Sequence, residues 1–182
     1  AAERLEERRF SLEPWVNETT RLVEPDRYIG VQESFELGGV RFTVSPVCAA
    51  HSDGDLTLYV EPDRILFSGD IIVEGRVPFM GDAKSGHWLE AIERMEVHEL
   101  MALVPGHGAA ANDPNQAIAS MRCDLSYLSD NMNVSVVDFI PFDEAYDATN
   151  WSEFEHLPAF AEANRRNAYQ VYLSMEAESL SE

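Results

Sequence analysis

Three short phrases between Ser45 and Gly108 decide how this chain of 182 residues is interpreted: Ala50-His51-Ser52-Asp53-Gly54-Asp55, Phe67-Ser68-Gly69-Asp70 and Val104-Pro105-Gly106-His107-Gly108. Each phrase follows an apolar run typical of a β-strand and sets an imidazole or a carboxylate beside glycine. Zinc and related ions take imidazole nitrogen and carboxylate oxygen as ligands. Any one of these side chains alone is an ordinary loop residue, but together they predict a metal site made of His51, Asp70 and His107.

The composition limits the classes of partner. Asp and Glu number 33 against 13 Lys and Arg, so the formal net charge is −20. Such a field repels nucleic acid and anionic membranes, and no apolar run reaches the roughly 20 residues that span a bilayer. With 45% hydrophobic residues the chain can bury a core. We therefore expect one domain over residues 1–182 and a small-molecule substrate, with neither nucleic acid nor membrane as partner. The compartment stays open.

The order of patterns predicts an α+β fold with a mostly antiparallel sheet. Gly38-Gly39 is a hairpin signal between two alternating runs. Two amphipathic helices and a helical tail from about Asp143 complete the pattern. The expected strands cover residues 33–37, 40–44, 56–60, 65–67 and 100–104, and the expected helices cover 82–95 and 113 to about 128, with a short β-branched stretch at 131–140.

The three phrases, in this order and with a helix before the last, resemble the second half of the metallo-β-lactamase superfamily. Two further stretches are similar to the branch of zinc metallohydrolases associated with quinoprotein and sulfur-oxidation systems: Gly75-Arg76-Val77-Pro78-Phe79-Met80-Gly81-Asp82-Ala83 and Arg166-Asn167-Ala168-Tyr169. The resemblance implies half of an αββα sandwich, a mostly antiparallel sheet flanked by helices, with metals at one edge.

The resemblance also implies roles for the three side chains. His51 would join the first metal and His107 the second, while Asp70, the expected catalytic residue, would bridge them. The metals would be two Zn²⁺ ions that activate water for attack on a carbonyl. The implied substrates are a lactam, a thioester, a lactone or another ester, and the sequence assigns no substrate-binding residue.

The principal motif of the superfamily, His-x-His-x-Asp-His, is absent from this chain, whose five His are all further apart. Zinc sites use at least three protein ligands for each ion. We therefore expect a companion chain or an N-terminal half to carry that motif. The start at Ala1, without Met, favours cleavage of a longer protein.

Two other interpretations stay open. A mononuclear iron enzyme such as a persulfide dioxygenase uses two His and one Asp, and a non-catalytic binding subunit would keep the fold without the site. Around His51, Asp53 and Asp55 are either partners that orient the imidazole or ordinary turn residues. His87 and Lys84 are either substrate contacts or solvated side chains.

Overall fold

The computed structural model describes residues 15, 17–19, 23, 25–47, 49–81, 83–95 and 99–179. The contacts within the chain divide it into two units, Ala1–Gly30 and Val31–Glu182. The sheet and the helices below all belong to the second unit. One domain over residues 1–182 stays a prediction.

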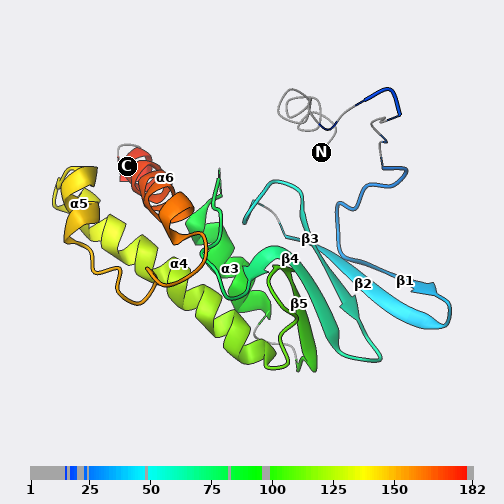
Figure 1. The fold of residues 1–182 in the computed structure, drawn as a ribbon. Coiled ribbons are helices and arrows are strands. Elements are labelled where there is room, and N and C mark those ends of the chain that lie inside the picture. The colour runs from blue at the N-terminus through cyan, green and yellow to red at the C-terminus, as the bar shows by residue number, and fades with distance from the viewer. Residues whose placement is uncertain are drawn as a thin grey trace. The chain divides into compact units, whose positions relative to one another are not determined.

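A five-stranded sheet in the order β1-β2-β3-β4-β5 forms the first layer of this unit (Figure 1). The first three pairings along this order are antiparallel, and β5 lies parallel to β4. The mostly antiparallel sheet is therefore confirmed. The strands are β1 Glu33–Leu37, β2 Val40–Val47, β3 Asp55–Val60, β4 Ile65–Val73 and β5 Ala102–His107.

The hairpin between β1 and β2 turns at the predicted glycines. Gly38 and Gly39 have φ of +62° and +79°, the two positive values that a tight type I′ turn requires. The turn sets the register in which Leu37 faces Val40. Glycine reaches both values without strain, which is why the pair was a strong sequence signal.

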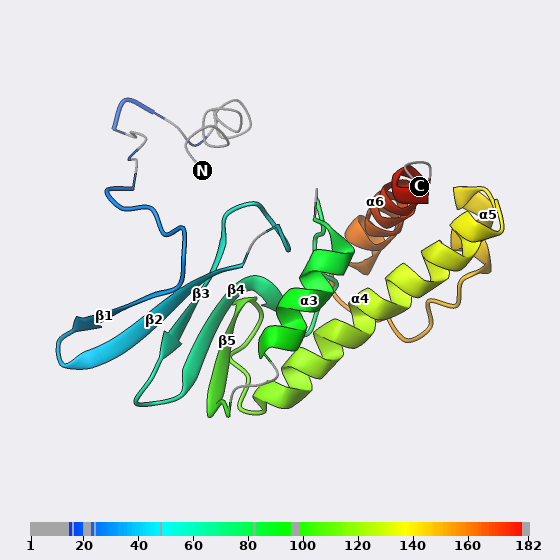
Figure 2. The same ribbon diagram turned by 180° about the vertical axis from the view of Figure 1, so that it is seen from behind.

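The helices form the second layer, on one side of the sheet (Figures 1 and 2). α3 and α4 pack against β4, and α6 packs along α4 with α5 at its far end. The fold is thus α+β, and it is half of an αββα sandwich. The helices are α3 Ser85–Met95, α4 Pro114–Val137, α5 Phe142–Ala148 and α6 Phe160–Ser179. In the described ranges, none of the helices has the length and apolarity needed to cross a membrane.

Helix α4 begins as predicted but is longer than predicted. The Asp113 carboxylate caps it by accepting from the Gln116 backbone N at 3.1 Å, with Pro114 as the first helical residue. The expected end near Leu128 and the separate β-branched stretch after it are wrong, because the helix continues to Val137. Met132 and Val136 extend its buried stripe by one turn each, and this packing overrides the weak helix propensity of the valines.

The two faces of the sheet differ in what covers them. Leu66 and Leu103 lie side by side on the face under α3 and α4, with exposed fractions of 4% and 0%. On the opposite face a row of apolar side chains crosses the sheet without a covering layer in the described unit, and Phe67 there is 42% exposed. Since cross-strand partners share a face, this row runs through Val44, Leu58, Phe67 and Val104.

Candidate metal centre

Asp70 lies where the pairing of β4 with β5 becomes irregular. Phe67 pairs with Val104 and Gly69 with Pro105, but the next pair is Val73 with His107, so residues of β4 bulge out between them. A bulge redirects side chains, and such irregularities are common beside active sites. Here it brings the Asp70 carboxylate to the end of β5, where His107 is the last strand residue.

The three side chains predicted as metal ligands meet at this edge. His51 Nδ1 lies 3.8 Å from Asp70 Oδ2, and His107 Nε2 lies 3.6 Å from Asp70 Oδ1. The carboxylate therefore stands between the imidazoles with one oxygen toward each. His107 has a side chain that is 59% exposed, against 24% for His51, so the cluster is open on the His107 side.

Glycine is required beside both the carboxylate and the second imidazole. A β-carbon on Gly106 would overlap Asp70 Oδ1 and would lie 2.7 Å from the Asp70 backbone N. Gly108 has φ of +101°, and a β-carbon there would overlap the Glu74 carbonyl oxygen. The Gly-His-Gly sequence thus lets β5 pass against the end of β4 at a distance that no other residue allows.

His51 is held by groups on two sides. Its Nε2 lies 3.1 Å from the Phe79 carbonyl oxygen, which can only accept, so Nε2 carries the proton of this hydrogen bond. The ring meets Trp88 edge to face at a centroid distance of 5.3 Å. Trp88 is fully buried and donates from Nε1 to the Ile71 carbonyl at 2.8 Å, which fixes the indole under the imidazole.

Asp55 belongs to the turn rather than to the support of His51. Its Oδ1 is 3.9 Å from His51 Nδ1, beyond hydrogen-bond range. Its two oxygens instead accept from Ser52, from the backbone N at 2.7 Å and from the hydroxyl at 2.6 Å. Of the possible substrate contacts, His87 and Lys84 are both exposed on or next to the first turn of α3.

The donor types fit zinc, but their number does not complete a site. Among the described residues, no three His, Cys, Asp or Glu side chains are arranged around one ion. Because Asp70 presents a different oxygen to each imidazole, each potential ion position has one nitrogen and one oxygen from the described residues. Zinc requires at least three protein ligands, so these residues make up part of a site.

A partly buried carboxyl group lies close enough to Glu74 to interact with it. Burial raises the pKa of Asp124, in α4, from 3.8 to about 6, and the nearby Glu74 carboxylate adds to the effect. The Glu74 backbone N donates to the His107 carbonyl at 2.9 Å, which ties the backbone of Glu74 to the end of β5. The sequence pattern did not single out either residue.

Asn167 is a buried polar side chain to which the sequence analysis assigned no role. It is 2% exposed in α6 and bonds to the backbone on both sides of Phe79. A signal existed, because Asn164 and Asn167 interrupt the otherwise apolar buried stripe of this helix. The other buried residues of the stripe are Ala163, Ala168, Val171 and Tyr172.

Several solved structures have a fold similar to that of this chain. Solved structures that resemble this chain include a metallo-beta-lactamase from Pontibacter korlensis, with 22% identity over 56% of this chain and 49% of that one at a TM-score of 0.51. A metallo-beta-lactamase family protein from Thermus thermophilus has 17% identity over 74% and 50%, with a TM-score of 0.56. The stereoselective inverting sec-alkylsulfatase of a Pseudomonas species has 15% identity over 84% and 27%, with a TM-score of 0.63.

The chain thus spans about half the length of the first two of these structures and about a quarter of the third. No curated protein matches it. Residues 3–107, more than half of the sequence, match the family described as the Metallo-beta-lactamase superfamily. The matched segment contains all three side chains of the candidate centre. The chain belongs to the metallo-β-lactamase superfamily.

Proposed function

We propose that this chain is part of a zinc-dependent hydrolase that cleaves a lactam, a thioester, a lactone or another ester. The observation that carries the proposal is the position of Asp70, whose two carboxylate oxygens face the imidazoles of His51 and His107 separately. A carboxylate with one oxygen toward each of two metal positions is suited to bridge a pair of ions. Asp70 is accordingly the proposed bridging and catalytic residue.

The distances support this assignment. Two ligands at about 2.0–2.1 Å from one tetrahedral zinc ion lie about 3.3 Å apart. The separations of 3.8 Å and 3.6 Å exceed this value by only a few tenths of an ångström. A small rotation of either imidazole closes the difference, so no movement of the strands is needed for Asp70 to share an ion with each ring.

The hydrogen bond of His51 supports it too. With the proton on Nε2 for the Phe79 carbonyl, the neutral ring keeps its lone pair on Nδ1, the atom that faces Asp70. Metal-binding histidines characteristically donate from their other nitrogen in this way. Bound zinc would supply Lewis acidity toward the substrate carbonyl and lower the pKa of a water molecule.

The remaining ligands, on this proposal, come from a companion chain or an N-terminal half with the His-x-His-x-Asp-His motif. Each ion position has two donors from the described residues and needs more. The uncovered apolar row through Phe67 supplies a surface of the kind that a second sheet packs against. Detection of only a 20.4 kDa species in active material would contradict this part of the proposal.

Metal analysis and a substrate panel test the activity together. The complete protein is purified without added metal, its zinc and iron are quantified, and it is assayed on a lactam, a thioester, a lactone and a simple aryl ester. We expect zinc, loss of hydrolysis on chelation and recovery with zinc. Iron in place of zinc would support the dioxygenase interpretation, and absence of both metals from a folded complex would support the non-catalytic one. Either result would overturn the proposal.

A further inference from the structure

A buried amide side chain of the C-terminal helix α6 makes two hydrogen bonds to the loop between β4 and α3. Asn167 donates from Nδ2 to the Pro78 carbonyl at 2.7 Å and accepts at Oδ1 from the Met80 backbone N at 3.0 Å. The two partners lie 89 and 87 residues earlier in the chain. One side chain therefore fixes the backbone on both sides of Phe79.

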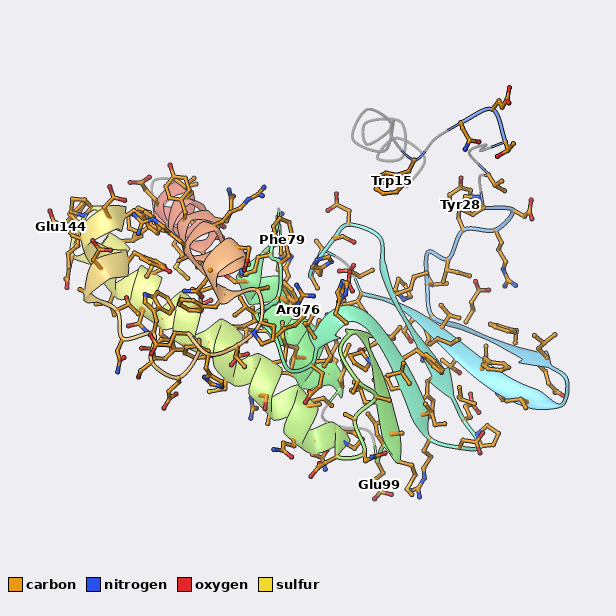
Figure 3. All side chains as sticks on the ribbon, viewed as in Figure 1. Trp15, Tyr28, Arg76, Phe79, Glu99 and Glu144 are labelled. Carbon is orange, nitrogen blue, oxygen red and sulfur yellow. The ribbon has the colours of Figure 1, made fainter. Side chains whose placement is uncertain are left out.

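The backbone between these two hydrogen bonds reaches the candidate centre. The Phe79 carbonyl is the group that meets His51 Nε2 at 3.1 Å. Outside the buried contact, the Arg166 guanidinium lies over the Phe79 ring, 4.8 Å from its centroid. Figure 3 labels Phe79 on this loop, beside the first turns of α6. Arg166 and Asn167, two consecutive residues of α6, thus contact the segment whose Phe79 carbonyl bonds to His51.

We propose that Asn167 is a positioning residue for His51. By fixing the Pro78–Met80 backbone it keeps the Phe79 carbonyl directed at Nε2, and this fixes the neutral ring with its proton on Nε2 and its lone pair on Nδ1, toward Asp70. The inference rests on the proposed function only in treating His51 as a metal ligand. The effect on the ring itself requires no metal.

The chemistry of the amide explains why this position is Asn. The carboxamide holds a donor group and an acceptor group at a fixed spacing, and here each end meets a complementary backbone group. Leucine would leave the Pro78 carbonyl and the Met80 N–H without partners in a buried place. Aspartate keeps the acceptor for Met80 but, when ionised, offers no donor to Pro78.

A second buried Asn on the same helix gives a matched control. Asn164 is 5% exposed, one turn before Asn167, and donates to the Tyr146 hydroxyl at 3.1 Å. Asn164→Ala removes the same group from the same helix, and none of the described hydrogen bonds joins Asn164 to the Pro78–Met80 loop. A purely structural role for Asn167 predicts that the two alanine variants behave alike.

The first measurement is the tautomer of His51, from the ¹⁵N shifts of its ring in the metal-free full protein under conditions where the ring is neutral. We expect the Nε2–H form in the wild type and in Asn164→Ala, and a mixture of both forms in Asn167→Ala and Asn167→Asp. The aspartate variant is isosteric and serves if the alanine variant does not fold. The same tautomer in all four proteins would overturn the proposal.

The second measurement is zinc affinity in the complete protein. Loss of an outer partner of a metal-binding histidine typically weakens metal binding by about 10–100-fold, and we expect this for Asn167→Ala and less than about 3-fold for Asn164→Ala. Equal weakening in the two would reject a positioning role. If the wild type binds no zinc while the tautomer still depends on Asn167, the proposed function fails and the positioning of His51 by Asn167 stands.

Discussion

Gly106 and Asp70 are packed so closely that atoms of Asp70 occupy the space that a β-carbon on Gly106 would need. Such an atom on Gly106 would overlap Asp70 Oδ1 and lie 2.7 Å from both the Asp70 backbone N and the Gly69 carbonyl carbon. Contacts of this kind with backbone atoms cannot be relieved by rotating a side chain. The position of the carboxylate between two imidazoles thus depends on a glycine in the neighbouring strand.

Gly106→Ala is expected to destabilise the protein by about 2–3 kcal/mol, as overpacking does in a rigid environment. It should also displace Asp70 and weaken zinc binding. Gly86→Ala is the control, because a β-carbon on Gly86 in helix α3 meets nothing within 4 Å. Chemical denaturation and zinc titration of both variants check the prediction, and equal stability of the two would contradict the close packing.

Trp88→Phe should affect the metal site as well as stability. The variant loses the Nε1–H bond to the Ile71 carbonyl, and leaving such a buried acceptor unpaired costs about 1–3 kcal/mol. It also changes the edge-to-face contact with His51. Trp151→Phe removes a similar bond, to the Tyr146 carbonyl at 3.0 Å, and none of the described ring contacts or hydrogen bonds joins Trp151 to His51, Asp70 or His107. We expect a lower Tm in both variants and weaker zinc binding only in Trp88→Phe.

Asp124 makes the stability of the metal-free protein depend on pH. Because its pKa is raised to about 6 in the folded state from 3.8, the folded protein binds this proton more tightly than the unfolded chain does. Its contribution is therefore most favourable below pH 3.8 and is lost as the pH rises to about 6. Asp124→Asn should remove this slope and, after allowance for solvent screening, raise stability at neutral pH by about 1 kcal/mol.

Asp130→Asn is the control for that change, since Asp130 is exposed on the same helix. The free energy of unfolding of both variants is measured by denaturant titration at a series of pH values between about 4 and 7. The Asp124 carboxyl titrates over this range. An unchanged slope in Asp124→Asn would show that the carboxyl group titrates at its ordinary pKa.

Phe67→Ser tests the uncovered face of the sheet. If a companion segment packs there, loss of the central aromatic side chain should lower the association or the activity of the complex by about 10-fold or more. Phe139→Ser is the matched change at a 92% exposed phenylalanine between α4 and α5, outside the sheet. Similar behaviour of the two in native mass spectrometry and activity assays would argue against a partner on this face.

Local chemistry explains which parts of the molecule could be predicted. The hairpin at Gly38-Gly39 and the cap at Asp113 depend on neighbouring residues, and both were found from sequence. The length of α4 was not, since Met132 and Val136 become helical through burial in the core, which the sequence near them does not encode.

The residues of the candidate centre also differ in how well the sequence predicted them. His51, Asp70 and His107 were identified by type, by glycine neighbours and by family resemblance, and the structure brings them together. Asn167 bonds to main-chain groups 87 and 89 residues away. The residue type at a position does not reveal such a bond, because every residue has a backbone carbonyl. Two features of the sequence pointed to Asn167 without assigning a role: the polar interruption of an apolar helix stripe and the family resemblance of Arg166-Asn167-Ala168-Tyr169.

The zinc content of the complete protein, compared with that of Asp70→Ala, tests the central claim most directly. If Asp70 bridges two ions, the wild type should bind about two zinc ions per complete site, as two-metal centres do, and the variant should bind fewer than about one. A zinc content in the variant equal to that of the wild type would contradict the bridging role of Asp70.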